Sequence, residues 1–142
     1  MSGPVVLLVE DHEDTREMYA LMLGASGFSV HEAPNPSDAL ALAHEHPPAV
    51  VVTDLRMSGA VTAATLCEHF RTQGVPVIAV TGVTPGAEQD LLREAGCAEI
   101  LLKPLTPPDL VVAVQRVLGA HASYANQSSP NRSASASASE QR

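Results

Sequence analysis

The stretch Val5-Val6-Leu7-Leu8-Val9-Glu10-Asp11 decides the fold: five apolar residues stop abruptly at two carboxylates. Three further apolar runs end in a similar way. They are residues 50–53 before Asp54, residues 75–80 before Thr81, and residues 100–102 before Lys103, the only lysine of the chain. Short β-branched runs of this kind are typical of strands buried on both faces of a parallel sheet. Because ligands bind outside the carboxyl ends of such strands, we expect three carboxylates, one hydroxyl and one amine to meet there.

Helical patterns separate the apolar runs, and this alternation predicts an α/β fold with a parallel sheet. A short strand expected at residues 28–32 completes five β-α units in about 120 residues. In the first expected helix, Met18, Leu21, Met22 and Ala25 have the i, i+3, i+4, i+7 spacing of a stripe that faces a core. We therefore expect these four side chains to be buried.

The last expected helix begins after Thr106, where a capping threonine precedes two prolines, and ends at Gly119. From residue 120 the composition shifts to Ser, Ala, Asn and Gln, with no apolar period. Such a segment cannot bury enough apolar surface to fold by itself. We expect one domain over residues 1–119 and a disordered Ser/Ala-rich tail over residues 120–142.

The composition disfavours several classes of function. Aromatic residues make up only 3% of the chain, so stacking platforms for single-stranded nucleic acid are not expected, and a net charge of −8 repels a phosphate backbone. No apolar run approaches the ~20 residues that span a bilayer, and no basic segment of a signal peptide precedes Val5. We expect a cytoplasmic protein without direct nucleic-acid or membrane binding. Cys67 and Cys97 lack CxxC spacing, so we expect two reduced thiols.

The residues at the expected strand ends predict a particular chemistry. At ~4 Å and an effective dielectric of ~20, each pair among Glu10, Asp11 and Asp54 would repel by about 4 kcal/mol, so a cation is needed between them. Hard oxygen ligands that leave positions for water suit Mg²⁺. Asp54 can also attack phosphorus and form an aspartyl phosphate, while Lys103 and Thr81 stabilise the phosphoryl oxygens. The sequence therefore predicts a Mg²⁺-dependent phosphoryl acceptor.

The same residues lie within short motifs in a fixed order. The motifs are Leu-Leu-Val-Glu-Asp-His-Glu-Asp at 7–14, Val-Val-Thr-Asp-Leu-Arg-Met at 51–57, Ala-Val-Thr-Gly at 79–82, Gly-Cys-Ala at 96–98 and Leu-Lys-Pro-Leu at 102–105. Together they resemble the response-regulator receiver domain of two-component signalling, over residues 4 to about 119. The resemblance implies a flavodoxin-like (βα)5 fold, a doubly wound parallel sheet with strand order 2-1-3-4-5.

The resemblance also implies a role for each residue. The Mg²⁺ ligands would be Glu10, Asp11, Asp54 and the backbone carbonyl of Arg56. Asp54 would be the phosphoacceptor, the hydroxyl of Thr81 would turn towards the phosphoryl group, and Lys103 would pair with one of its oxygens. In the family, the bond from this lysine to the following proline, here Pro104, is commonly cis.

Two segments depart from the family pattern. Residues 57–62 read Met-Ser-Gly-Ala-Val-Thr, where relatives often have Met-Pro-x-Met-Asp-Gly, so the next helix is expected to start about one residue later. Ile100 stands where relatives carry a Tyr or Phe that moves inward when the hydroxyl residue swings over. Because an isoleucine reports the movement of Thr81 only weakly, we expect weaker coupling to the face formed by the fourth helix, fifth strand and fifth helix.

These features predict a single-domain response regulator. A sensor histidine kinase or a histidine phosphotransfer protein would donate the phosphoryl group to Asp54, and an unidentified downstream protein would read the change through direct contact. The chain would catalyse only its own phosphorylation and autodephosphorylation, so we do not expect an enzyme acting on a separate substrate. A phosphorelay intermediate or a phosphate sink would use the same chemistry, and both alternatives stay open.

Two other classes fit the sequence less well. An aspartate-based phosphohydrolase usually has a second aspartate two residues after its nucleophile, but that position holds Arg56. A flavodoxin-like nucleotide-binding module requires a Gly-rich or Ser/Thr-rich loop after the first strand. Residues 10–13 instead read Glu-Asp-His-Glu, which would repel a phosphate in the absence of metal.

Overall fold

The computed structural model describes residues 3–54, 62–82 and 87–128, with the side chains of residues 87–89, 91 and 121–128 left undescribed. Strands and helices alternate along these ranges. The strands are β1 (Val5–Val9), β2 (Ser29–Ala33), β3 (Val50–Asp54), β4 (Val77–Thr81) and β5 (Glu99–Leu102). The helices are α1 (Glu13–Ala25), α2 (Pro36–Glu45), α3 (Ala63–Thr72), α4 (Ala87–Glu94) and α5 (Pro107–Ser128).

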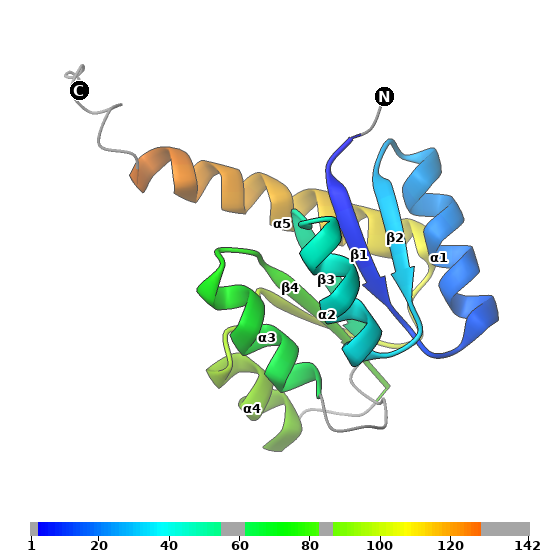
Figure 1. The fold of residues 1–142 in the computed structure, drawn as a ribbon, viewed down its shortest axis with the longest axis horizontal. Coiled ribbons are helices and arrows are strands. Elements are labelled where there is room, and N and C mark those ends of the chain that lie inside the picture. The colour runs from blue at the N-terminus through cyan, green and yellow to red at the C-terminus, as the bar shows by residue number, and fades with distance from the viewer. Residues whose placement is uncertain (1–2, 55–61, 83–86, 129–142) are drawn as a thin grey trace.

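The five strands form one parallel sheet in the order β2-β1-β3-β4-β5 (Figure 1). This arrangement confirms the predicted fold class and strand order. Viewed as in Figure 1, α2, α3 and α4 lie in front of the sheet and α5 lies behind it. Since every strand runs in the same direction, the polar residues that follow the strands meet at one edge.

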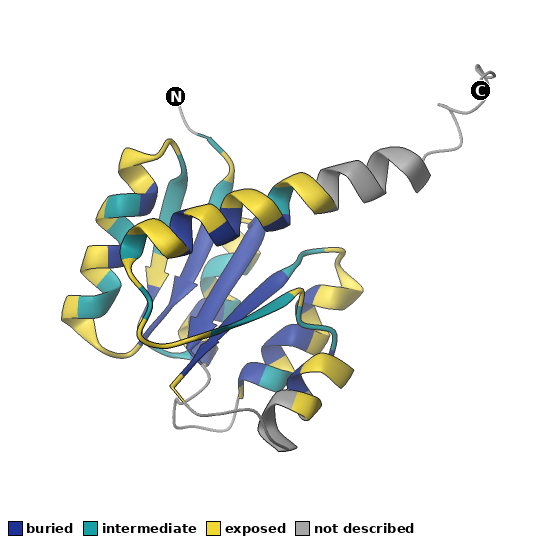
Figure 2. Ribbon diagram, turned by 180° about the vertical axis from the view of Figure 1, so that it is seen from behind, coloured by how far each residue is buried: buried dark blue, intermediate teal, exposed yellow. Residues whose placement is uncertain are grey.

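A separate apolar core fills the space on each face of the sheet. Side chains alternate between the faces along a strand, so Leu7 and Val9 join the core under α2 and α3, whereas Val6 and Leu8 join the core under α1 and α5. Figure 2 shows the central strands as almost entirely buried. This burial on both faces explains why the strands read as continuous apolar runs.

Side chains that cap the helices fix where three of them begin. The pair Asn35-Pro36 predicts a capping residue followed by a proline at the first helical position. In the structure, Asn35 accepts a hydrogen bond from the backbone N–H of Asp38 at 2.8 Å, and Pro36 occupies the first turn of α2. Thr106 accepts from the N–H of Asp109 at 3.2 Å before α5, and Thr62 caps α3. The pair Thr84-Pro85 predicts a cap for the fourth helix in the same way, but these two residues lie outside the described residues.

The predicted buried stripe of α1 is wrong by one residue. Tyr19 and Leu23 are its buried residues, whereas Met18 is 48% exposed and Leu21 is 76% exposed. The hydroxyl of Tyr19 donates to the carbonyl of Leu105 at 3.2 Å, so the ring packs against the sheet while its polar end reaches the loop before α5. Tyr19, whose hydroxyl has a hydrogen-bond partner, is therefore buried in place of the adjacent Met18, which the aliphatic spacing predicts to be buried.

The last helix is longer than predicted. α5 does not end at Gly119 but continues to Ser128. Alanine is the strongest helix former, and Ala120, Ala122 and Ala125 offset the cost of about 1 kcal/mol that glycine imposes within a helix. Residues 129–142 lie outside the described residues. Within the described chain, no helix is long and apolar enough to cross a membrane.

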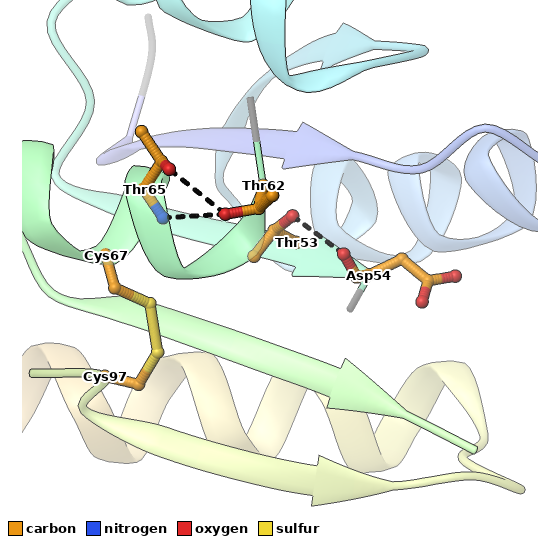
Figure 3. Close-up of a disulfide and its surroundings, with 6 residues drawn as sticks. All are labelled: Thr53, Asp54, Thr62, Thr65, Cys67 and Cys97. Carbon is orange, nitrogen blue, oxygen red and sulfur yellow. Dashed lines mark hydrogen bonds between the residues drawn. A yellow bond between two sulfur atoms is a disulfide. The ribbon is translucent and has the colours of Figure 1, made fainter. Parts of the chain in front are cut away.

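The two cysteines form a disulfide, so the prediction of two reduced thiols is wrong. Cys67 lies on α3 and Cys97 lies just before β5, with their Cα atoms 5.5 Å apart (Figure 3). This Cα separation is typical of disulfides. The cysteines are 30 residues apart in the sequence, and only the packing of α3 beside β4 and α4 brings them together. No local spacing motif could therefore have indicated the pairing.

Candidate functional site

The carboxyl edge of the sheet collects the polar residues that the sequence singled out. Neighbouring strands end at about the same height at this edge. Val9 pairs with Thr53, Asp54 with Val80, and Thr81 with Leu102. The next residues along β1 and β5 are Glu10 and Lys103, and the N–H of Lys103 donates to the carbonyl of Thr81 at 2.8 Å. The parallel topology thus gathers side chains from four strands at one site.

Three carboxylates form an acidic cluster, defined as Glu10, Asp11 and Asp54. Each of these residues offers one oxygen, and the three oxygens lie within 4.8 Å of one another. Glu10 is 4% exposed and Asp54 is 7% exposed, whereas Asp11 is open to solvent. An all-oxygen cluster that is solvent-accessible on one side fits Mg²⁺, which retains several waters when bound to protein carboxylates.

The loop after β1 holds Glu10 in position. Its N–H donates to the carbonyl of Ala33 at 3.0 Å, and its Oε2 accepts from the N–H of His12 at 3.0 Å. Arg16 donates from Nη1 to the backbone carbonyl of Glu10 at 2.9 Å and also pairs with Glu32 at 3.4 Å. No motif in the sequence indicates this role of Arg16, because its two partners are fixed by where α1 lies relative to the ends of β1 and β2.

The acidic cluster has an unfavourable charge distribution. Burial raises the pKa of Glu10, and the neighbouring charge of Asp54 raises it further, although the N–H of His12 and the charge of Lys103 oppose the shift. The site therefore disfavours having all its carboxylates ionised. A divalent cation among these oxygens would remove this conflict.

Lys103 provides the positive charge on the other side of Asp54. Its Nζ lies 3.0 Å from Oδ2 of Asp54, and the lysine side chain is 35% exposed against 8% for the aspartate. Burial alone would favour the neutral amine, but the hydrogen bond and the charge of Asp54 outweigh it, so the pKa of Lys103 is raised and the ammonium persists. The peptide bond from Lys103 to Pro104 is cis, as the resemblance implied.

Thr81 ends β4 and is completely buried. Gly82 follows it, and a Cβ added there would lie 4.0 Å from Cδ of Lys103, so the lysine stem passes close to this glycine. On β3, the hydroxyl of Thr53 donates to the carbonyl of Asp54 at 3.1 Å. Five of the six predicted site residues thus come together at this edge.

Arg56 and Ile100 are the two remaining positions that the sequence singled out. The backbone carbonyl of Arg56 and the loop at residues 57–61 lie outside the described residues, so these expectations stay predictions. Ile100 pairs with Ala79 across the sheet and packs, partly buried, against the core under α2 and α3. The position of the switch aromatic therefore holds an aliphatic side chain on the interior side of β5.

Comparison with known proteins agrees with this fold. Residues 6–115 match the family model of the response regulator receiver domain. This match covers more than half of the chain, so the chain belongs to the response regulator receiver family of two-component signalling.

Several relatives are similar over nearly their whole length. The polar-differentiation response regulator DivK of Brucella anthropi is 29% identical over 117 residues, which are 80% of this chain and 95% of that protein. The structure of the chemotaxis protein CheY4 of Vibrio cholerae aligns with a TM-score of 0.74 and 27% identity, covering 82% of this chain and 99% of that one. The receiver domain of the putative response regulator NarL from Mycobacterium tuberculosis aligns with a TM-score of 0.74 and 28% identity, covering 84% and 98%.

Proposed function

We propose that Asp54 accepts a phosphoryl group from a phosphohistidine, carried by a sensor histidine kinase or by a histidine phosphotransfer protein. The arrangement around Asp54 carries this proposal: its carboxylate lies 3.0 Å from the Lys103 ammonium and shares an oxygen cluster with Glu10 and Asp11. A buried carboxylate between a cation and a metal-binding cluster is poised to react with a phosphoryl group and to hold it.

Each residue around Asp54 has a distinct role in the phosphoryl transfer. An oxygen of Asp54 forms a bond to phosphorus as the phosphorus–nitrogen bond of the donor histidine breaks. Negative charge on the phosphoryl oxygens is then met by the Lys103 ammonium, which moves from the carboxylate to one of these oxygens, and by the hydroxyl of Thr81. Mg²⁺ held by Glu10, Asp11 and Asp54 would neutralise further charge and orient the phosphoryl group.

The phosphorylated protein then signals by a shift between two conformational states. The added charge lies beside Thr81 and Lys103, at the ends of β4 and β5. It therefore biases the equilibrium between two conformations of these strand ends and the segments that follow them. A downstream protein binds one of the two conformations. Because Ile100 replaces the Tyr or Phe of relatives, phosphorylation shifts this equilibrium less than it does in them. A phosphorelay intermediate or a phosphate sink remains the alternative output. The chain catalyses only the phosphorylation and dephosphorylation of its own aspartate. The reaction takes place in the cytoplasm, where ATP is the source of the kinase's phosphoryl group.

A single labelling experiment tests the acceptor. Wild-type protein incubated with Mg²⁺ and acetyl phosphate should gain one phosphoryl mass, and Asp54→Asn should gain none, because the amide cannot form the acyl phosphate. Asp90→Asn is the matched control, since Asp90 is an exposed aspartate of α4, and it should be labelled like wild type. An equal adduct in wild type and Asp54→Asn would refute the assignment.

A further inference from the structure

The disulfide joins α3 to the chain just before β5. Its two ends are Cys67, midway along α3, and Cys97, two residues before β5 begins. The enclosed segment contains β4 and α4, and therefore also Thr81 of the candidate site. Figure 3 shows the disulfide well away from Asp54, towards the ends at which β4 and β5 begin. The bond therefore restrains this segment from the side opposite the acidic cluster.

The two cysteines differ in their access to solvent. Cys67 is 0% exposed and lies in the core with Leu66 and Phe70, whereas Cys97 is only partly buried. Thiol–disulfide exchange requires a thiolate to reach one of the two sulfur atoms. Access therefore favours attack at Cys97, with Cys67 as the leaving group.

An arginine lies beside this pair. Arg71 follows Cys67 by four residues in α3, so the two side chains share a side of the helix. The Arg71 side chain also lies over Gly96, the neighbour of Cys97: a Cβ added at Gly96 would fall 3.2 Å from Nε and Nη1 of Arg71. No ion pair of Arg71 is found among the described residues. A guanidinium in this position favours a sulfur that leaves as a thiolate.

We propose that Cys67 and Cys97 form a reversible redox site, opened by a dithiol reductant and closed by a small disulfide. A thiolate of the dithiol attacks Sγ of Cys97, the bond between the two Sγ atoms breaks, and Cys67 leaves as a thiolate that takes up a proton. The second thiol of the reductant then attacks the mixed disulfide and releases Cys97 as a thiol. The reductant has given up two electrons and two protons and departs as a disulfide. Closure is the reverse exchange with an oxidised disulfide.

The state of this bond controls how firmly the segment from α4 to β5 is held. β5 has four residues and lies at the edge of the sheet, where it pairs with β4 alone. Among the described side chains of residues 87–98, only Leu92 and Ala95 are buried. Segments with few buried contacts open most readily. The ladder with β4, the hydrogen bond from the N–H of Ala98 to the carbonyl of Val77 and the ion pair between Glu99 and Arg116 also hold this segment. The link to α3 adds a covalent restraint to these contacts, and reduction removes it.

Reduction of the native protein tests the chemistry. Folded wild-type protein is treated with dithiothreitol, transferred to acid to stop the exchange, freed of reductant and then alkylated in denaturant, which gives the reagent access to the buried Cys67. It should gain two alkyl groups, and oxidised glutathione added to the folded reduced protein before the acid step should restore the unmodified mass. Arg71→Gln should open several-fold more slowly, whereas Arg93→Gln, which removes an exposed arginine paired with Asp90 at 3.8 Å, should open like wild type. A bond that opens only in denaturant would overturn the proposal, and equal opening rates in wild type and Arg71→Gln would overturn the role of Arg71.

Hydrogen exchange tests the restraint, without any phosphodonor, so its result is independent of the chemistry at Asp54. Amides of residues 92–102 should exchange faster after reduction of wild type, while amides of β1 should not change. The double variant Cys67→Ala/Cys97→Ala should exchange fast in this segment with or without dithiothreitol. Unchanged exchange of residues 92–102 on reduction would contradict the restraint, even if the bond itself opens and closes.

Discussion

Ionisation of the Glu10 side chain is costly to the folded state. Its pKa is raised above the ordinary value of 4.5, by burial and by the charge of Asp54. The folded state therefore holds this proton more tightly than the unfolded chain, so this group lowers stability as the pH rises from 4.5 through the raised value. Above the raised pKa and without metal, the ionised carboxylate destabilises the fold.

Replacing Glu10 with glutamine should therefore stabilise the metal-free protein. In EDTA at pH 7, we expect Glu10→Gln to raise the free energy of unfolding in urea by on the order of 1 kcal/mol. The gain should vanish at acid pH, and Mg²⁺ should stabilise the variant less than it stabilises wild type. The exposed Glu45→Gln is the control and should change neither quantity. A destabilised Glu10→Gln at pH 7 would show that the carboxylate is a structural anchor instead.

Lys103 should matter to the reaction more than to stability. Lys103→Gln removes the cation 3.0 Å from Asp54, and we expect phosphorylation by acetyl phosphate to slow by about 100-fold, as when one donor to a developing charge is lost. Because the side chain is 35% exposed, the loss in unfolding free energy should stay below about 1 kcal/mol. Initial labelling rates give the first quantity, with Arg93→Gln as the control cation. Wild-type rates in Lys103→Gln would remove this residue from the mechanism.

Single residues were predictable where backbone direction alone places them. Glu10, Asp11, Asp54, Thr81 and Lys103 each end or follow a strand, and parallel strands bring such positions together whatever the details of packing. Arg16 and the Cys67–Cys97 pair were not predictable in this way. Their partners depend on how helices pack against the sheet, which short-range spacing does not encode.

Among the elements, helix starts were predicted better than helix ends. Capping residues act within one turn, so Asn35 and Thr106 could be recognised from their immediate neighbours. The end of α5 depends instead on propensity summed over several residues beyond Gly119, and the buried face of α1 depends on the hydrogen bond between Tyr19 and Leu105. A single glycine does not determine where a helix ends, and an aliphatic spacing does not by itself determine which face of a helix is buried.

The cap of α5 gives a direct test at this scale. Thr106→Ala removes the oxygen that accepts from the N–H of Asp109 at 3.2 Å, so we expect a loss of about 1 kcal/mol in the free energy of unfolding. Thr106→Ser retains the hydroxyl and should recover most of this loss. Urea titration measures both variants, and an alanine variant as stable as wild type would mean that water replaces the cap without cost.

At the scale of the whole molecule, the sheet divides the interior into two cores. Val9 belongs to the core under α2 and α3, and Val114 of α5 belongs to the core on the other face. Val9→Ala and Val114→Ala should each cost roughly 2 kcal/mol. Since the two side chains belong to separate cores, the double variant should lose the sum to within about 0.5 kcal/mol. A larger deviation in urea unfolding would show that the sheet transmits strain between its faces.

The helix α5 gives the molecule a built-in spacer. Its 22 residues span about 33 Å, whereas a five-residue strand spans about 17 Å, and Figure 1 shows the helix extending well past the sheet. A fluorophore or a second protein attached near Ser128 would therefore stand clear of the domain on a stiff rod. With a second dye on β2, such a label would report the distance between the sheet and the end of α5. The label near Ser128 would not lie against the site around Asp54.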